Sequence, residues 1–169
     1  LPKDLRPALR RLGVSFGALD IFVPALLKPA PRRVLHDLGL DMRPLEPAML
    51  PVIANNRHLP AGYRSAGSQA IRIDLAEKLL RQSFDARASA SKRRPGKPFA
   101  LDPALAISIG LEHANCRRLL GSAGFSFRPA RTLREGEFGP PAPDLWHWRP
   151  RRKSSDADDG RSNRRTRGP

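Results

Sequence analysis

Apolar residues between positions 102 and 125 recur at helical spacing on both sides of a glycine. Asp102 is a helix-capping residue, and Pro103 follows it at the first helical position, where a missing N–H costs nothing. After Gly110, apolar side chains lie three, four and seven residues apart, at Cys116, Leu119, Leu120 and Ala123. This pattern predicts two short helices joined by a tight turn, which is the helix-turn-helix arrangement.

The polar face of the second predicted helix carries groups that can reach phosphates and base edges. Its members are Glu112, His113, Asn115, Arg117, Arg118 and Ser122. We therefore expect this face to be exposed and to contact nucleic acid. An ordinary helical hairpin inside a small core has the same apolar spacing, so that alternative stays open at this point.

A longer amphipathic helix is predicted over residues 75–90, with Asp74 as its cap. Its apolar stripe consists of Ile73, Ala76, Leu79, Leu80 and Phe84. Glu77 and Arg81 are four residues apart and are expected to form an ion pair on the helix surface. Two short extended arms around a Gly-Ser turn precede this helix within residues 63–73. We expect the three helices to pack as one unit.

A short strand is predicted directly after the helix pair, because Phe125 and Phe127 alternate with polar residues. A strand at this place is typical of the wing of a winged helix, and three arginines would lie on or near it: Arg128, Arg131 and Arg134. A proline-rich extended run then leads to Trp146 and Trp148, which point the same way in an extended chain. We expect these tryptophans to pack on their own domain; stacking on bases is the alternative.

The first forty residues alternate short helical and extended patterns. Residues 4–12 predict a helix, and residues 14–16 and 20–23 predict extended segments. Residues 31–38 predict a second helix, whose inward-facing residues would be Val34, Leu35 and Leu38.

The fold class predicted from these elements is mainly α with short β segments. It comprises a helical and extended accessory region (1–40), a Pro-rich connector (41–62), a winged-helix-like unit (63–135), an extended Pro/Trp segment (136–152) and a disordered basic tail (153–169). Prolines in the connector exclude a long helix or a central strand there. The tail holds too few apolar residues to offset the entropy of ordering it.

The charge balance favours a polyanionic partner. The sequence has 31 Lys and Arg against 16 Asp and Glu, which gives a formal net charge of +15. A genome rich in G and C also raises the arginine content, so part of this excess can have that cause. The basic loop at residues 91–98 is expected to be either a phosphate contact or a solvated loop. The residues expected to contact nucleic acid are Lys92, Arg93, Arg94, Lys97, His113, Asn115, Arg117, Arg118, Arg128 and Arg131.

Motifs that mark common active sites are absent from the sequence. There is no GxxxxGK[ST], HExxH, CxxC or GxSxG, and the histidines have no metal-ligand spacing. The single cysteine, Cys116, excludes an internal disulfide and is expected to be a small core residue. We therefore expect no catalytic residue, cofactor or metal in this chain, no membrane partner and a cytoplasmic location.

Three long blocks carry a family resemblance: LRRLGVSFGALDIFVPALLKP (residues 9–29), GYRSAGSQAIRIDLAEKL (62–79) and KPFALDPALAISIGLEHANCRRLLGSAGF (97–125). Together with the closing FGPPAPDLWHWRPRR, they resemble alphaproteobacterial helicase-related proteins akin to the mitochondrial degradosome RNA helicase of superfamily 2. The resemblance implies the C-terminal part of an ATP-dependent helicase, with the ATP- and Mg-binding motor domains upstream. No position here matches a motor motif, so no catalytic residue carries over.

The function expected from the charge, the helix pair and the resemblance is that of an accessory region of an RNA or DNA helicase. This region would hold backbone phosphates while the upstream motor hydrolyses ATP. The sequence does not begin with Met, as expected if it is a fragment of a longer protein. A stand-alone winged-helix regulator is one alternative, and it would need a sequence-specific duplex site. A protein-docking module for a partner such as a nuclease is the other.

Overall fold

The structure is a computed structural model that describes residues 4–40, 49–93, 96–136, 138–140 and 142–149. Helices and small antiparallel sheets alternate along the chain, so the fold is mixed α and β. The elements are α1 (Leu5–Arg11), β1 (Ser15–Phe16), β2 (Ile21–Phe22), η1 (Pro24–Leu27), α2 (Pro29–Asp37), β3 (Val52–Ala54), β4 (Tyr63–Ala66), β5 (Gln69–Arg72), α3 (Ile73–Arg93), α4 (Ala104–Ser108), α5 (His113–Ser122), β6 (Phe125–Arg128) and β7 (Leu145–Trp148).

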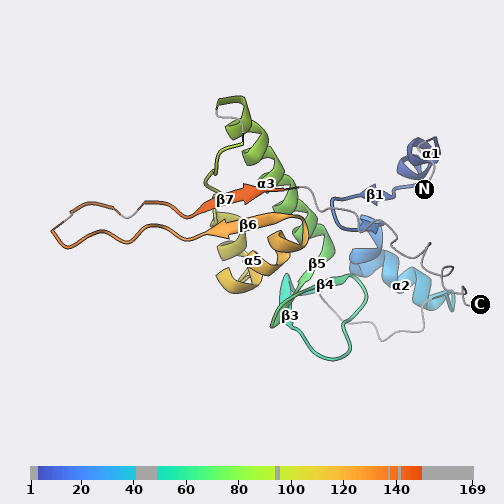
Figure 1. Ribbon diagram of the computed structural model, residues 1–169. Helices are drawn as coiled ribbons and strands as arrows, with labels where there is room; N and C mark the ends of the chain where they lie inside the picture. Colours follow the sequence, from blue (N-terminus) through green and yellow to red (C-terminus); the bar gives the residue numbers. More distant parts are fainter. Residues whose placement is uncertain (1–3, 41–48, 94–95, 137, 141, 150–169) are drawn as a thin grey trace, which may run out of the picture.

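The hydrophobic core lies between α3, the strands β4 and β5 that precede it and the elements that follow it (Figure 1). Its fully buried large side chains come from β5, α3 and α5: Ile71, Leu80, Leu119 and Leu120. The three-stranded sheet β3-β5-β4 is antiparallel, and β5 runs directly into α3. The core stripe predicted for α3 is confirmed at Ala76, Leu79 and Leu80.

The two short helices predicted after residue 102 are present. Asp102 Oδ1 accepts a hydrogen bond from the Ala104 N–H at 2.9 Å, and α4 begins there. Gly110 adopts a φ of +75°, a left-handed conformation that favours glycine, and the chain turns into α5 at this point. The apolar spacing of α5 is confirmed, because Cys116, Leu119 and Leu120 are all buried.

Strands β6 and β7 form a hairpin whose two limbs are far apart in sequence. They pair from Phe125↔Trp148 to Arg128↔Leu145, and Trp146 also bridges to Phe99. Pro129 follows the last pair and has no N–H to continue the ladder. Residues 129–136, 138–140 and 142–144 therefore lie outside the sheet and form an arm that projects from the body (Figure 1).

Both tryptophans pack on their own domain, as we expected. Trp146 is 5% exposed, and its ring lies 5.2 Å from the ring of Phe127. Trp148 donates a hydrogen bond from Nε1 to the Ala123 carbonyl at 3.0 Å, and the guanidinium of Arg87 covers its ring at 3.8 Å. Stacking of Trp146 on a base is therefore excluded by its burial.

The proline-rich connector contains one short strand. β3 pairs with β5 at the edge of the sheet, so the exclusion of a central strand there is confirmed. The predicted turn between the two extended arms is also confirmed, at Gly67 and Ser68 between β4 and β5. Residues 41–48 of the connector and the predicted disordered tail at 153–169 lie outside the described residues.

Helix α2 is present, but of its predicted inward residues only Leu35 is half-buried, and the prediction is wrong for Val34 and Leu38. Val34 is 56% exposed and Leu38 is 66% exposed, because α2 packs mainly on η1 and does not reach the core around α3. Helical spacing identifies an apolar face, but it does not show whether another element covers that face.

A buried carboxylate joins the N-terminal segment to α3. Glu77 is 9% exposed and accepts hydrogen bonds from the backbone N–H groups of Ala18, Leu19 and Asp20, at 2.5, 2.8 and 2.8 Å. Glu77 is thus not the surface partner of Arg81 that its spacing predicted. Asp20 in turn pairs with Arg64 and raises the pKa of that guanidinium above its usual value through this hydrogen bond.

Candidate nucleic-acid interface

Helix α5 presents two adjacent arginines to solvent. Cys116, Leu119 and Leu120 turn its apolar face toward the core, so Arg117 and Arg118 are left on the opposite side and are exposed. Together with Ala114 and Phe127 they line a shallow hollow of about 400 Å³. Neither arginine forms an ion pair with another described residue. Their charges are therefore not neutralised within the part of the chain that the structure describes.

Arg117 is held in place by an aromatic ring. Its guanidinium carbon lies 4.0 Å from the centre of the Phe127 ring, a stacked position that leaves the N–H groups at the edge of the guanidinium. The Phe127 ring packs edge-on against Trp146 and against His113, each at 5.2 Å. The guanidinium thus rests on a platform that the core fixes, a feature that the sequence did not reveal.

Asp144 braces the base of the arm against this platform. One carboxylate oxygen accepts a hydrogen bond from the Ala130 N–H at 2.8 Å, and the other lies 3.7 Å from His113 Nε2. Because Ala130 and Asp144 stand on the two limbs of the arm, the carboxylate ties the limbs to each other and to α5. His113, predicted to contact nucleic acid, therefore has a structural partner, although 59% of its side chain is exposed.

The predicted exposure of Asn115 is wrong. Asn115 is 3% exposed; its amide donates to Ser68 Oγ and Gln69 Oε1, each at 2.9 Å, and to Glu112 Oε2 at 3.0 Å. Its oxygen accepts from the Ser68 N–H at 3.1 Å. Asn115 therefore joins α5 to the β4–β5 turn and cannot reach a ligand. Its position four residues before Leu119 places it on the buried face, a signal present in the sequence.

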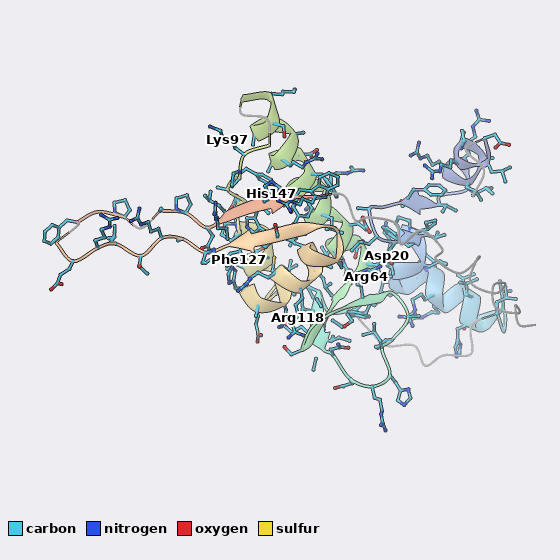
Figure 2. The ribbon with its side chains drawn as sticks, viewed as in Figure 1. Asp20, Arg64, Lys97, Arg118, Phe127 and His147 are labelled. Carbon is cyan, nitrogen blue, oxygen red and sulfur yellow. The ribbon has the colours of Figure 1, made fainter. Side chains whose placement is uncertain are left out.

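The basic loop between α3 and α4 lies away from the arginines of α5. Lys92 and Lys97 are exposed, whereas Arg94 and the side chain of Arg93 lie outside what the structure describes. Figure 2 shows Lys97 near the C-terminal end of α3 and Arg118 on the far side of the β6–β7 hairpin, beside the β4–β5 sheet. The fold thus does not bring the predicted contact residues into one continuous surface.

The end of β6 and the arm carry further exposed arginines. Arg128 ends β6, Arg131 lies on the outgoing limb of the arm, and both are exposed. Four exposed arginines thus lie on α5, at the end of β6 and on the arm. Because successive side chains of a strand point to opposite faces, Arg128 lies on the other face of β6 from Phe127. We use the term α5–arm surface for Arg117, Arg118, Phe127, Arg128 and Arg131.

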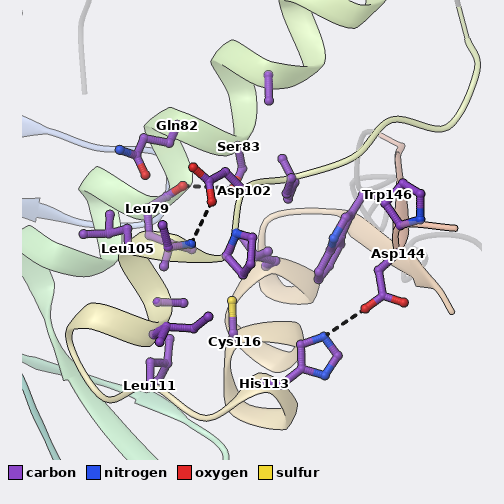
Figure 3. A pocket seen from close by; sticks show the side chains of 18 residues that line it. Leu79, Gln82, Ser83, Asp102, Leu105, Leu111, His113, Cys116, Asp144 and Trp146 are labelled. Carbon is purple, nitrogen blue, oxygen red and sulfur yellow. Dashed lines mark hydrogen bonds and ion pairs between the residues drawn. The ribbon is translucent and has the colours of Figure 1, made fainter. Parts of the chain in front are cut away.

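A separate cavity of about 630 Å³ lies between α3, α4, α5 and β7 (Figure 3). Its lining is mostly apolar and includes Leu79, Leu105, Leu111, Cys116 and Trp146. Cys116 is 9% exposed, which confirms it as a core residue, and burial raises the pKa of its thiol from 9.0 to about 11.

The buried thiol predicts a loss of stability at high pH. Between pH 9 and about pH 11 the unfolded chain releases the Cys116 proton while the folded chain retains it. The unfolded state then binds fewer protons, so the free energy of unfolding falls as pH rises, by about 2 kcal/mol in total. Urea unfolding of wild type and of Cys116→Ala at pH 9 and pH 11 measures this fall in the free energy of unfolding, which should be smaller in Cys116→Ala. An equal pH dependence in the two proteins would contradict this assignment.

In the described part of the chain no helix is long and apolar enough to cross a membrane, and no three His, Cys, Asp or Glu side chains are grouped to hold a metal ion. Comparisons with protein-family models, curated proteins and solved structures found no match to this chain.

Proposed function

We propose that residues 63–149 form a winged-helix-like unit that binds nucleic acid through the α5–arm surface. The order of elements supports this proposal: α3, the bridge at Phe99, the α4–α5 pair and then the β6–β7 hairpin with its long connecting arm. In a winged helix the second helix of the pair and the wing meet the ligand. Here these elements are α5 and the arm, which carry the exposed arginines.

The stacking of Arg117 on Phe127, beside the exposed Arg118, is the observation on which the proposal chiefly rests. A guanidinium held over a fixed ring has lost side-chain entropy before binding, and its N–H groups can bind a phosphate in a bidentate manner. Residues 63–149 also carry fifteen Lys and Arg against eight Asp and Glu, so the unit itself is basic.

The surface favours contact with backbone phosphates over recognition of base sequence. Side chains that read adenine in the major groove are chiefly Asn and Gln, and Asn115, the only one of these on α5, is buried. The exposed polar groups of α5 are instead a carboxylate, an imidazole and two arginines. We therefore propose binding that depends on charge and shape.

Within a larger protein, this unit would be an accessory part of an ATP-dependent RNA or DNA helicase. This step rests on the family resemblance of residues 9–29, 62–79 and 97–125. The upstream motor would bind ATP and Mg²⁺ and hydrolyse ATP, and the unit described here would hold the strand.

A protein-docking role is a second candidate, and it is favoured by apolar side chains exposed in the N-terminal segment. Leu12, Leu38 and Leu40 are 76%, 66% and 72% exposed. These residues lie outside the α5–arm surface, so docking at this segment and nucleic-acid binding at α5 are separable.

The proposal predicts steeply salt-dependent binding of the full chain to nucleic acid. Four phosphate contacts from Arg117, Arg118, Arg128 and Arg131 give a slope of about −3 in a plot of log K against log salt for a single strand. Fluorescence anisotropy with labelled RNA and DNA oligonucleotides of two unrelated sequences measures the affinity and its salt slope. Affinities that differ little between the sequences would support backbone binding. A lack of binding at low salt would refute the proposal.

A further inference from the structure

The most exposed large apolar side chain described in the structure belongs to Phe138, which is 98% exposed. It lies on the arm, just past the turn at residues 135–136 that reverses the chain direction. An exposed aromatic ring costs free energy in water. The Phe138 ring packs neither in the core nor on the β6–β7 sheet.

Glycines lie close to Phe138 on both sides along the chain. Gly136 and Gly139 have φ values of +84° and +134°, and a side chain added at either would meet no atom within 4 Å. Gly139 thus adds no side chain next to Phe138, whose ring is exposed. A flat partner could approach it, as a base does when it stacks on an aromatic side chain.

The two limbs of the arm are joined to each other and to α5 at its base. Asp144 joins the two limbs through the Ala130 N–H and contacts His113 on α5. The arm begins at Arg128, and Arg131 and Arg134 are exposed along its outgoing limb. From Arg128 to Arg134 an extended chain spans about 20 Å, the rise of roughly six nucleotides along one strand of B-form DNA.

We infer that Phe138 stacks on an unpaired base of the nucleic acid held by the α5–arm surface. The inference rests on the proposed function and adds the class of substrate: a strand with exposed bases, above all a junction between single and double strand. Inside a duplex both faces of every base are already stacked, and insertion there costs the loss of that stacking. At a junction the first unpaired base has a face on which an aromatic ring can stack.

The test uses the full chain with three labelled probes of equal length: a blunt duplex, a single strand, and a duplex with a single-stranded overhang. Phe138→Ala is expected to lower affinity for the overhang and the single strand by about tenfold, with little change for the blunt duplex. Its salt slope should match that of wild type, because no phosphate contact is lost. Phe138→Trp should retain the wild-type affinities, since a second aromatic ring can stack.

Leu133→Ala is the matched control, because Leu133 lies on the same arm, is 45% exposed and has no aromatic ring. It should leave all three affinities unchanged. With 2-aminopurine at the junction, wild type should quench the fluorescence through stacking, and Phe138→Ala should not.

Two results would overturn the inference: Phe138→Ala binds all three probes like wild type, or it loses the same affinity for the blunt duplex as for the others. Failure of wild type to bind any probe would instead overturn the proposed function, and with it this inference. A thermal unfolding midpoint equal to that of wild type is expected for each arm variant, since these side chains are not in the core.

Discussion

Replacement of both Arg117 and Arg118 by glutamate is expected to weaken binding of single-stranded nucleic acid by roughly a hundredfold at low salt. Two phosphate contacts are lost, and two repulsive charges take their place on α5. The salt slope should also decrease in size by about 1.4, because two fewer counterions are displaced. Fluorescence anisotropy over a range of salt concentrations gives both quantities.

The matched control reverses two charges elsewhere on the surface. Lys78 and Arg81 are exposed on α3 and line a hollow with Phe16 and Gly17 of the N-terminal segment. The Lys78→Glu, Arg81→Glu double variant has the same net charge as the α5 variant. It should lose only the small part of the affinity that comes from long-range attraction. Equal losses in the two variants would show that net charge, and not the α5–arm surface, governs binding.

Replacement of Trp146 by alanine is expected to lower the free energy of unfolding by about 3–5 kcal/mol. Trp146 is 5% exposed, packs on Phe127, and lies in the strand that bridges to Phe99. Its loss would open a cavity between the hairpin and α5 and remove the support of the Arg117 platform. Urea unfolding followed by far-ultraviolet circular dichroism measures the change.

Phe138→Ala serves as the control for this substitution, since it removes an aromatic ring of similar size that is 98% exposed. Its stability should equal that of wild type within about 0.5 kcal/mol. If Trp146→Ala were equally mild, the β6–β7 hairpin would not be part of the cooperative core, and a fixed platform for Arg117 could not be maintained.

Local signals in the sequence were sufficient for the elements around α5. A capping aspartate, a glycine between two helical patterns and alternating phenylalanines each act within a few residues, and the structure has helices and a strand at those places. The packing of the tryptophans followed from the same logic, because two aromatic rings on one face of an extended chain can bury a large area.

Contacts between distant parts of the chain could not be predicted in this way. Glu77 accepts three backbone N–H groups about sixty residues away, and Asn115 holds a turn that is 47 residues away. Local spacing treats such polar residues as surface groups. Whether α2 finds a partner for Val34 and Leu38 is likewise decided by tertiary structure. The Arg117–Phe127 platform also depends on how α5 meets β6, which no local pattern specifies.

The central claim is that nucleic acid lies on α5 and the arm. Amide and arginine side-chain chemical shifts, followed by NMR while a short single strand is added to the full chain, test this claim most directly. We predict that the largest shifts occur at Arg117, Arg118, Arg128 and Arg131, with residues 5–37 nearly unchanged. Shifts concentrated in α1 and α2, or spread evenly over the basic residues of the whole chain, would contradict the account.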